Sequence, residues 1–182
     1  MEQFEKLADF VEEYRRKIKD FNDVLDYYVY IDYKRLNDDI KNSIIEITDI
    51  INKKLADKFM SKYEDIDEAI FIIEPVFEEI ITEVKKLKGL YSKLDKYDKY
   101  DKKLTIYKKI ILKILNELEM FFIKLENLLL RGGEGELKFE IDVTDEIMEL
   151  KDMFHSEEVK KVGFSSLLFG LGLGWLIFGG DD

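Results

Sequence analysis

Among the side chains that commonly carry out acid–base or metal chemistry, carboxylates are plentiful in this chain, with 40 Asp and Glu, but cysteine and histidine are nearly absent. The chain has no cysteine, which excludes disulfides, thiolate zinc sites and cysteine nucleophiles, and its only histidine is His155. Asp152 precedes His155 by three positions, but a di-iron centre in a helical protein requires Glu-x-x-His pairs on two helices. No glycine-rich loop has the phosphate-binding spacing, and no serine lies in a recognisable triad neighbourhood. We therefore expect a protein that is not an enzyme and that binds no metal or other cofactor.

Lysines and tyrosines are concentrated between Val84 and Lys113, where they provide chemistry for binding anions. This stretch contains eleven lysines and three aspartates. This stretch could meet an acidic partner or an anionic lipid surface, near which each lysine contributes about 1 kcal/mol to binding. The lysines considered for such a contact are Lys85, Lys86, Lys88, Lys102, Lys103, Lys108 and Lys109. The alternative is a hairpin end whose lysines are only solvated and keep it soluble.

The overall composition predicts a mainly helical protein of ordinary domain size. The chain has 182 residues, of which 46% are hydrophobic and 38% charged, and it contains a single proline. Such a mixture can bury a core, which excludes general disorder. The net charge of −11 is opposite to that of proteins that coat nucleic acid by neutralising phosphates, so no nucleic-acid partner is expected.

Apolar residues recur at helical spacing over most of residues 1–131, which we interpret as one helical domain. In the first thirty residues the repeat alternates between three and four positions. Its members are Phe4, Leu7, Val11, Tyr14, Ile18, Phe21, Leu25 and Tyr28. This spacing places them on one stripe that a partner helix must cover. Further helices are predicted over residues 38–60, 67–94 and 102–131, with a cap near Asp65 and a turn around 95–101. Pro75 would be either a first-turn residue or a kink.

Two all-α architectures fit this pattern. Four helices joined by short polar turns would form an elongated up-and-down antiparallel bundle. If the breaks near residues 37 and 98 are only surface features, two long helices, 2–62 and 67–131, would instead form one coiled-coil hairpin about 90 Å long.

Residues 132–161 are predicted to form a linker with a short extended segment and short helices. Leu137, Phe139, Ile141 and Val143 alternate with polar residues, as in a half-buried strand. Thr144 with Asp145 then resembles a helix cap.

Residues 162–180 differ from the rest of the chain because they contain no charged residue. As a glycine-rich hydrophobic helix, this segment would rise about 28 Å, close to the thickness of the bilayer hydrocarbon. Lys160 and Lys161 precede it and Asp181 and Asp182 follow it, which would keep the N-terminal domain cytoplasmic. No secretory signal is expected, because residues 1–5 are acidic. We expect a single-pass, C-terminal membrane anchor.

Small residues in this segment recur every four positions, at Ser166, Gly170 and Gly174, and would form a groove for close helix packing. Trp175 would lie near a membrane interface. The groove predicts a homo-oligomer.

We consider three functions. The first is a membrane-anchored helical scaffold or adaptor that acts through protein–protein contacts with an unknown partner. The second is a membrane-active pore former or channel subunit whose glycine-rich tail inserts on cue. The third is a soluble, cytoplasmic partner-binding protein whose tail packs in its core.

Overall fold

The computed structural model describes residues 2–22, 24, 32–60, 63–131, 137, 139–156 and 176–177. Most of these residues are helical, so the all-α prediction is confirmed. The helices are α1 (Glu2–Lys19), α2 (Tyr33–Asp49), α3 (Ala56–Met60), α4 (Ile66–Asp95), α5 (Lys102–Leu130) and α6 (Thr144–Ser156). A π-helical segment, η1 (Ile50–Leu55), joins α2 to α3, and the strands β1 (Glu140–Ile141) and β2 (Leu176–Ile177) pair with each other.

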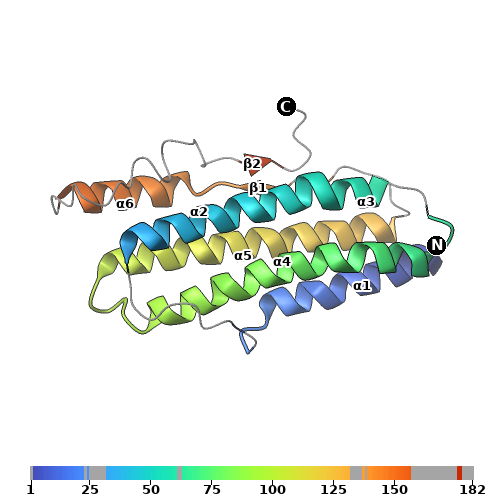
Figure 1. Ribbon diagram of the computed structural model, residues 1–182, viewed down its shortest axis with the longest axis horizontal. Helices are drawn as coiled ribbons and strands as arrows, with labels where there is room; N and C mark the ends of the chain where they lie inside the picture. The colour runs from blue at the N-terminus through green and yellow to red at the C-terminus, as the bar shows by residue number, and fades with distance from the viewer. Residues whose placement is uncertain are drawn as a thin grey trace.

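Four long helical segments lie side by side: α1, the continuous α2–η1–α3, α4 and α5 (Figure 1). The chain reverses direction after each of them. The helix α1 packs against α4 and α5, and α2–η1 packs against α4 on the other side. These bounds agree with four helical segments and not with two very long helices.

Aspartate side chains begin three of these segments by accepting free backbone N–H groups. Asp32 accepts from Lys34 at 3.0 Å, Asp65 from Glu68 at 2.8 Å, and Asp101 from Lys103 at 3.0 Å. Such caps satisfy N–H groups that have no partner within the helix. The cap at Asp65 was predicted from the sequence.

The first helix is shorter than the apolar repeat predicts. It ends at Lys19, and Phe21, which belongs to the predicted stripe, is 42% exposed. The carboxylate of Asp20 accepts the N–H of Asn22 at 2.8 Å, a local turn that competes with continuation of the helix. The last two members of the repeat, Leu25 and Tyr28, lie outside the described residues.

The second helix begins five residues earlier than predicted. Asp32 is its cap, so Asn37 is not a capping residue but lies within α2, fully buried. Pro75 is exposed and lies inside α4, well beyond the first turn where the missing N–H would cost nothing.

The core is continuous, and Phe77 of α4 lies at its centre. Its ring lies 5.1–6.4 Å from the rings of Phe10, Tyr14, Phe59 and Phe122, which come from α1, α3 and α5. Aromatic contacts at these distances add stabilisation beyond the area that they bury. One side chain thus links all four helical segments.

The segment after α5 contributes to the same core. Phe139, Ile141 and Val143 are at most 1% exposed, as the alternating pattern predicts, and Leu150 and Phe154 of α6 are also buried. Residues 139–154 therefore form part of the folded body, although the sequence places them in a linker. The helix α6 begins at Thr144 as expected.

Two residues of the apolar C-terminal run are described, and they are extended. Leu176 pairs with Ile141 and Ile177 pairs with Glu140 in an antiparallel register. The helix predicted over 162–180 is therefore not observed at these two positions, which form a strand. The other residues of that segment lie outside the described part of the chain.

Candidate functional site

The turn between α4 and α5 carries the lysines and tyrosines that the sequence marks for anion binding. We name residues 95–102 the hairpin tip; they contain the repeated order Asp, Lys, Tyr with a final Lys102. Backbone hydrogen bonds close the turn, among them Asp98 N–H to Leu94 O at 2.9 Å and Tyr100 N–H to Tyr97 O at 3.0 Å. The prediction of a turn here is confirmed.

All three aspartates of the hairpin tip make contacts within the protein. Lys108 Nζ donates to Asp95 Oδ1 at 2.6 Å and to Asp98 Oδ2 at 2.8 Å. Asp101 caps α5 and also pairs with Lys103 Nζ at 3.3 Å. The hydrogen bond from Lys108 holds the pKa of the Asp98 carboxyl below its ordinary value, and the two carboxylates raise the pKa of Lys108.

The lysines and tyrosines of the hairpin tip point outward. Tyr97 is 42% exposed and Tyr100 is 77% exposed. Lys96, Lys99 and Lys102 are exposed and make no ion pair with a described residue. Lys99 Nζ lies 5.0 Å from the centre of the Tyr100 ring. The folded turn therefore separates the two signs of charge, with lysines outside and aspartates held by other lysines.

Lys88, one of the seven lysines considered from the sequence, is buried. It is 1% exposed, and its Nζ donates to the backbone carbonyls of Lys17, at 2.8 Å, and Asp20. The same ammonium lies 5.0 Å from the ring centre of Phe21. The last carbonyls of a helix lack partners within it and carry partial negative charge, so this lysine caps α1 from another helix.

Lys103 lies in a second internal cluster, where the beginnings of α2 and α5 meet the end of α6. It is 6% exposed, and its Nζ lies 5.4 Å from the ring centre of Tyr33 and 5.6 Å from that of Phe154. Beside it, the buried Tyr107 hydroxyl donates to Asn37 Oδ1 at 2.7 Å. Burial raises the pKa of Tyr107, because the phenolate would be poorly solvated there.

The remaining four candidates lie nearer the surface. Lys102 and Lys109 are exposed, whereas Lys85 and Lys86 are half-buried. Lys86 pairs with Glu83 at 3.1 Å. Of the seven lysines, Lys102 and Lys109 therefore face solvent, and the other five make contacts within the protein. The structure adds Lys96 and Lys99 to the lysines that face solvent.

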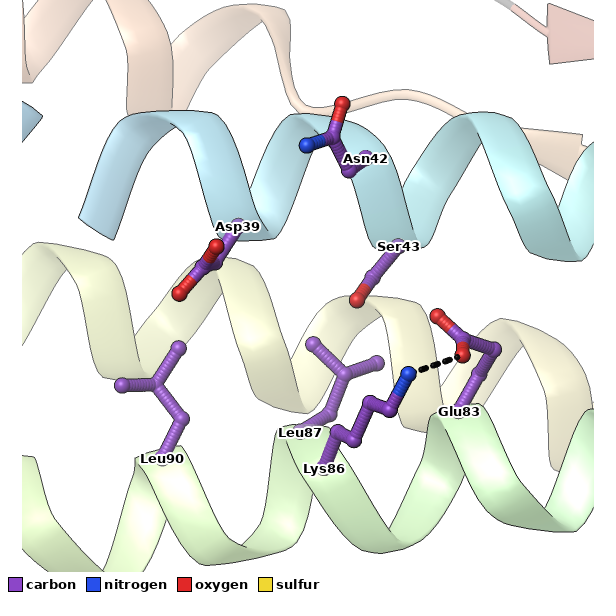
Figure 2. A pocket seen from close by; sticks show the side chains of 7 residues that line it. All are labelled: Asp39, Asn42, Ser43, Glu83, Lys86, Leu87 and Leu90. Carbon is purple, nitrogen blue, oxygen red and sulfur yellow. Dashed lines mark hydrogen bonds and ion pairs between the residues drawn. The ribbon is translucent and has the colours of Figure 1, made fainter. Parts of the chain in front are cut away.

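A shallow groove lies between α2 and α4, as Figure 2 shows. Asp39 and Ser43 project into it from α2, and Glu83 and Lys86 from α4; Asn42, Leu87 and Leu90 complete the lining. Its volume of about 220 Å³ is below the range of about 300–1,000 Å³ that is usual for ligand pockets. It contains no nucleophile–base pair, and we assign no chemistry to it.

The structure gives little support for a metal site, and it does not describe the predicted helix-packing residues of the C-terminal segment. The described ranges contain no group of His, Asp and Glu side chains able to hold a metal ion, and His155 is exposed. Ser166, Gly170, Gly174 and Trp175 lie outside the described residues. Within the part of the chain that the structure covers, no helix has the length and hydrophobicity required to cross a bilayer.

Comparisons with known proteins give no relative. The chain matches no family model, no curated protein and no solved structure.

Proposed function

We propose that this protein is a non-enzymatic scaffold: an up-and-down helical bundle that residues 162–180 attach to a membrane and that acts by binding other proteins. One observation carries the proposal. Those 19 residues have no charge, in a chain of which 38% is charged. A helix of this length and composition suits the bilayer interior. Attachment would raise the effective concentration of partners at the membrane, with the helical body on the cytoplasmic side.

A second candidate is a partner-binding protein without an anchor, whose tail packs against its own body. The pairing of β2 with β1 favours it. Leu176 and Ile177 cannot occupy a strand beside β1 and a membrane-spanning helix at the same time. The two candidates therefore predict opposite responses when the tail is altered or held in place.

The first test places one charge at two depths of the segment. A charge at the centre of a spanning helix costs about 2.5–3.5 kcal/mol, and much less near the ends. We expect Leu171→Asp to reduce co-flotation of the full chain with phosphatidylcholine vesicles about 100-fold. The matched control Gly163→Asp, at the edge of the run, should reduce it far less. Equal effects, or no flotation of the unaltered chain, would reject the anchor.

The second test holds the tail on the body. The chain has no cysteine, so Glu140→Cys with Ile177→Cys introduces a single pair at facing strand positions. Facing residues of antiparallel strands lie within the range of Cα separations that a disulfide spans. We expect the oxidised chain to lose flotation and the reduced chain to regain it, with Ile177→Cys alone unaffected. Flotation that is the same in both redox states would show that the tail is not the membrane element.

Self-association through the small-residue groove is tested with isoleucine. Gly170→Ile with Gly174→Ile should reduce the oligomer size in detergent micelles, because a branched side chain prevents close helix approach. Gly172→Ile is the control, since that position lies on the opposite face of a helix. Unchanged oligomers would remove the groove from the proposal. Release of trapped dye from the vesicles would favour the pore-forming alternative over a simple anchor.

A further inference from the structure

The hairpin tip presents cationic and aromatic side chains on one exposed end of the molecule. Tyr100 is more exposed than Tyr97, at 77% against 42%. The neighbouring Lys96, Lys99 and Lys102 make no ion pair with a described residue. Tyrosine is enriched at the level of lipid headgroups, where its ring meets apolar chains and its hydroxyl meets water. Lysine beside it is attracted to anionic headgroups.

The aspartates of the same turn are paired with other lysines, although the side chain of Asp95 is 61% exposed. Asp95 and Asp98 are paired with Lys108, whose side chain is 13% exposed. Asp101 is held by the first turn of α5 and by Lys103. The outward lysines therefore face solvent without an ion-pair partner from their own turn.

One acidic stretch of the chain lies toward the other end of the molecule, whereas Asp32, Asp38, Asp39 and Asp152 lie at the end where the hairpin tip is. Between Tyr63 and Val84 there are eight carboxylates and no basic residue. The beginnings of α1 and α4 lie together, because the two helices run in the same direction: Phe10 contacts Phe77 and Phe21 contacts Tyr91. Glu83, the last carboxylate of this stretch, precedes the end of α4 by 12 residues, about 18 Å along a helix. This exceeds two Debye lengths at physiological ionic strength, so the acidic stretch is screened from the hairpin tip.

The chain also leaves its last helix at the end of the molecule where the hairpin tip lies. The helix α6 runs toward that end (Figure 1). Near its end, the ring centre of Phe154 lies 5.6 Å from Lys103 Nζ. Val162 follows Ser156 by six residues, which span at most about 20 Å. The apolar run therefore begins within reach of the hairpin tip.

We infer that the hairpin tip is a second membrane contact, which binds anionic lipid headgroups through Lys96, Lys99 and Lys102 with Tyr97 and Tyr100 at the interface. This inference rests on the proposed membrane attachment and specifies the surface that the body turns toward the bilayer. The tail provides attachment that does not depend on lipid charge, whereas the hairpin tip provides preference for anionic lipid.

The test compares two triple variants of the full chain on two kinds of vesicle. Lys96→Gln, Lys99→Gln and Lys102→Gln remove the outward charges of the hairpin tip. The control removes the same number of charges toward the end that carries the acidic stretch, with Lys6→Gln, Lys53→Gln and Lys124→Gln. Partition is measured on phosphatidylcholine vesicles with and without about one-third phosphatidylserine, at low and physiological salt.

We expect the hairpin variant to lose about ten- to 100-fold of the partition ratio between anionic and neutral vesicles, since each lysine contributes about five-fold. The control should lose less than about two-fold. Equal losses in the two variants, or a ratio near one for the unaltered chain, would overturn the inference, as would preferential binding to soluble polyglutamate. Failure of the tail appears separately, as lack of partition into neutral vesicles.

Discussion

Lysines at the end of the molecule that carries the hairpin tip differ in their contacts: some bind groups inside the protein and others face solvent. On the inner side, Lys88 and Lys103 are at most 6% exposed and bind helix carbonyls, a carboxylate and aromatic rings. On the outer side, Lys99 lies a few residues away in the sequence and faces solvent. The sequence between Val84 and Lys113 contains no obvious mark that separates the two groups. A count of lysines therefore overestimates the charge that a partner would meet.

The largest effect that tests this comparison is expected at Lys88. Lys88→Met removes two hydrogen bonds from a buried ammonium to carbonyls at the end of α1 and leaves those acceptors without this donor. Bonds to a charged group contribute about 1.5–3 kcal/mol each, so we expect the free energy of unfolding to fall by about 2–3 kcal/mol. Urea denaturation measures it.

The matched control is Lys109→Met, the same substitution at an exposed lysine of α5. It should change the free energy of unfolding by less than about 0.5 kcal/mol. Similar losses in the two variants would contradict a special role for the inner lysine.

The next effect is expected at the buried pair beside Lys103. Tyr107→Phe removes the donor to Asn37 Oδ1, and Asn37 Nδ2 already lacks a partner among the described residues. An unsatisfied buried acceptor costs about 1–3 kcal/mol, which thermal or urea unfolding would detect. Adding Asn37→Leu should recover most of the loss, because both polar partners are then absent.

Tyr100→Phe is the control for this pair, since its hydroxyl is at an exposed position. A loss as large as that of Tyr107→Phe would mean that the phenol, and not its burial, determines stability. The raised pKa of Tyr107 adds a pH effect. Its stabilisation is present below the ordinary tyrosine pKa of 10.0 and is lost as the pH rises through the higher folded value.

A smaller effect is expected for Lys108, which lies between the two surfaces. Lys108→Gln removes the ion pairs with Asp95 and Asp98. Because Asp95 is largely exposed, we expect a loss of about 0.5–1 kcal/mol at neutral pH in urea denaturation.

The lowered pKa of Asp98 fixes the pH dependence of that contribution. A carboxyl with a lower pKa in the folded state stabilises above its ordinary value of 3.8. The stabilisation disappears as the pH falls through the folded value. The unaltered chain and Lys108→Gln should therefore become more alike in stability as the pH falls below 3.8, and a constant difference would contradict the pairing.

The smallest effect on stability is expected on the outer surface. Lys99→Gln removes a lysine with no ion pair to a described residue and should change the free energy of unfolding by less than about 0.5 kcal/mol. Its effect on partition into anionic vesicles should nevertheless exceed that of Lys88→Gln measured on the folded fraction. The reverse order would remove the distinction between inner and outer lysines.

Much of the fold was predictable because it depends on local pattern. The helical spacing of residues such as Val11 and Ile18, the cap at Asp65, the turn after Asp95 and the alternation around Ile141 all agree with the structure. Each depends on side chains within a few positions of one another, and periodicity reports which face they share. The end of α1 was not predictable in this way, since its cap is Lys88, 68 residues further along the chain than Asp20.

The sequence alone determined a helical, acidic body with a lysine-rich turn and an uncharged C-terminal run, because composition and periodicity are properties of neighbouring residues. Only the tertiary structure decided which lysines are available. Packing α1 and α6 against the α4–α5 pair encloses Lys88 and Lys103 and leaves Lys96 and Lys99 outside. The reason is that burial and hydrogen bonding between distant segments follow from how helices pack, and a lysine's own neighbours in sequence do not specify them.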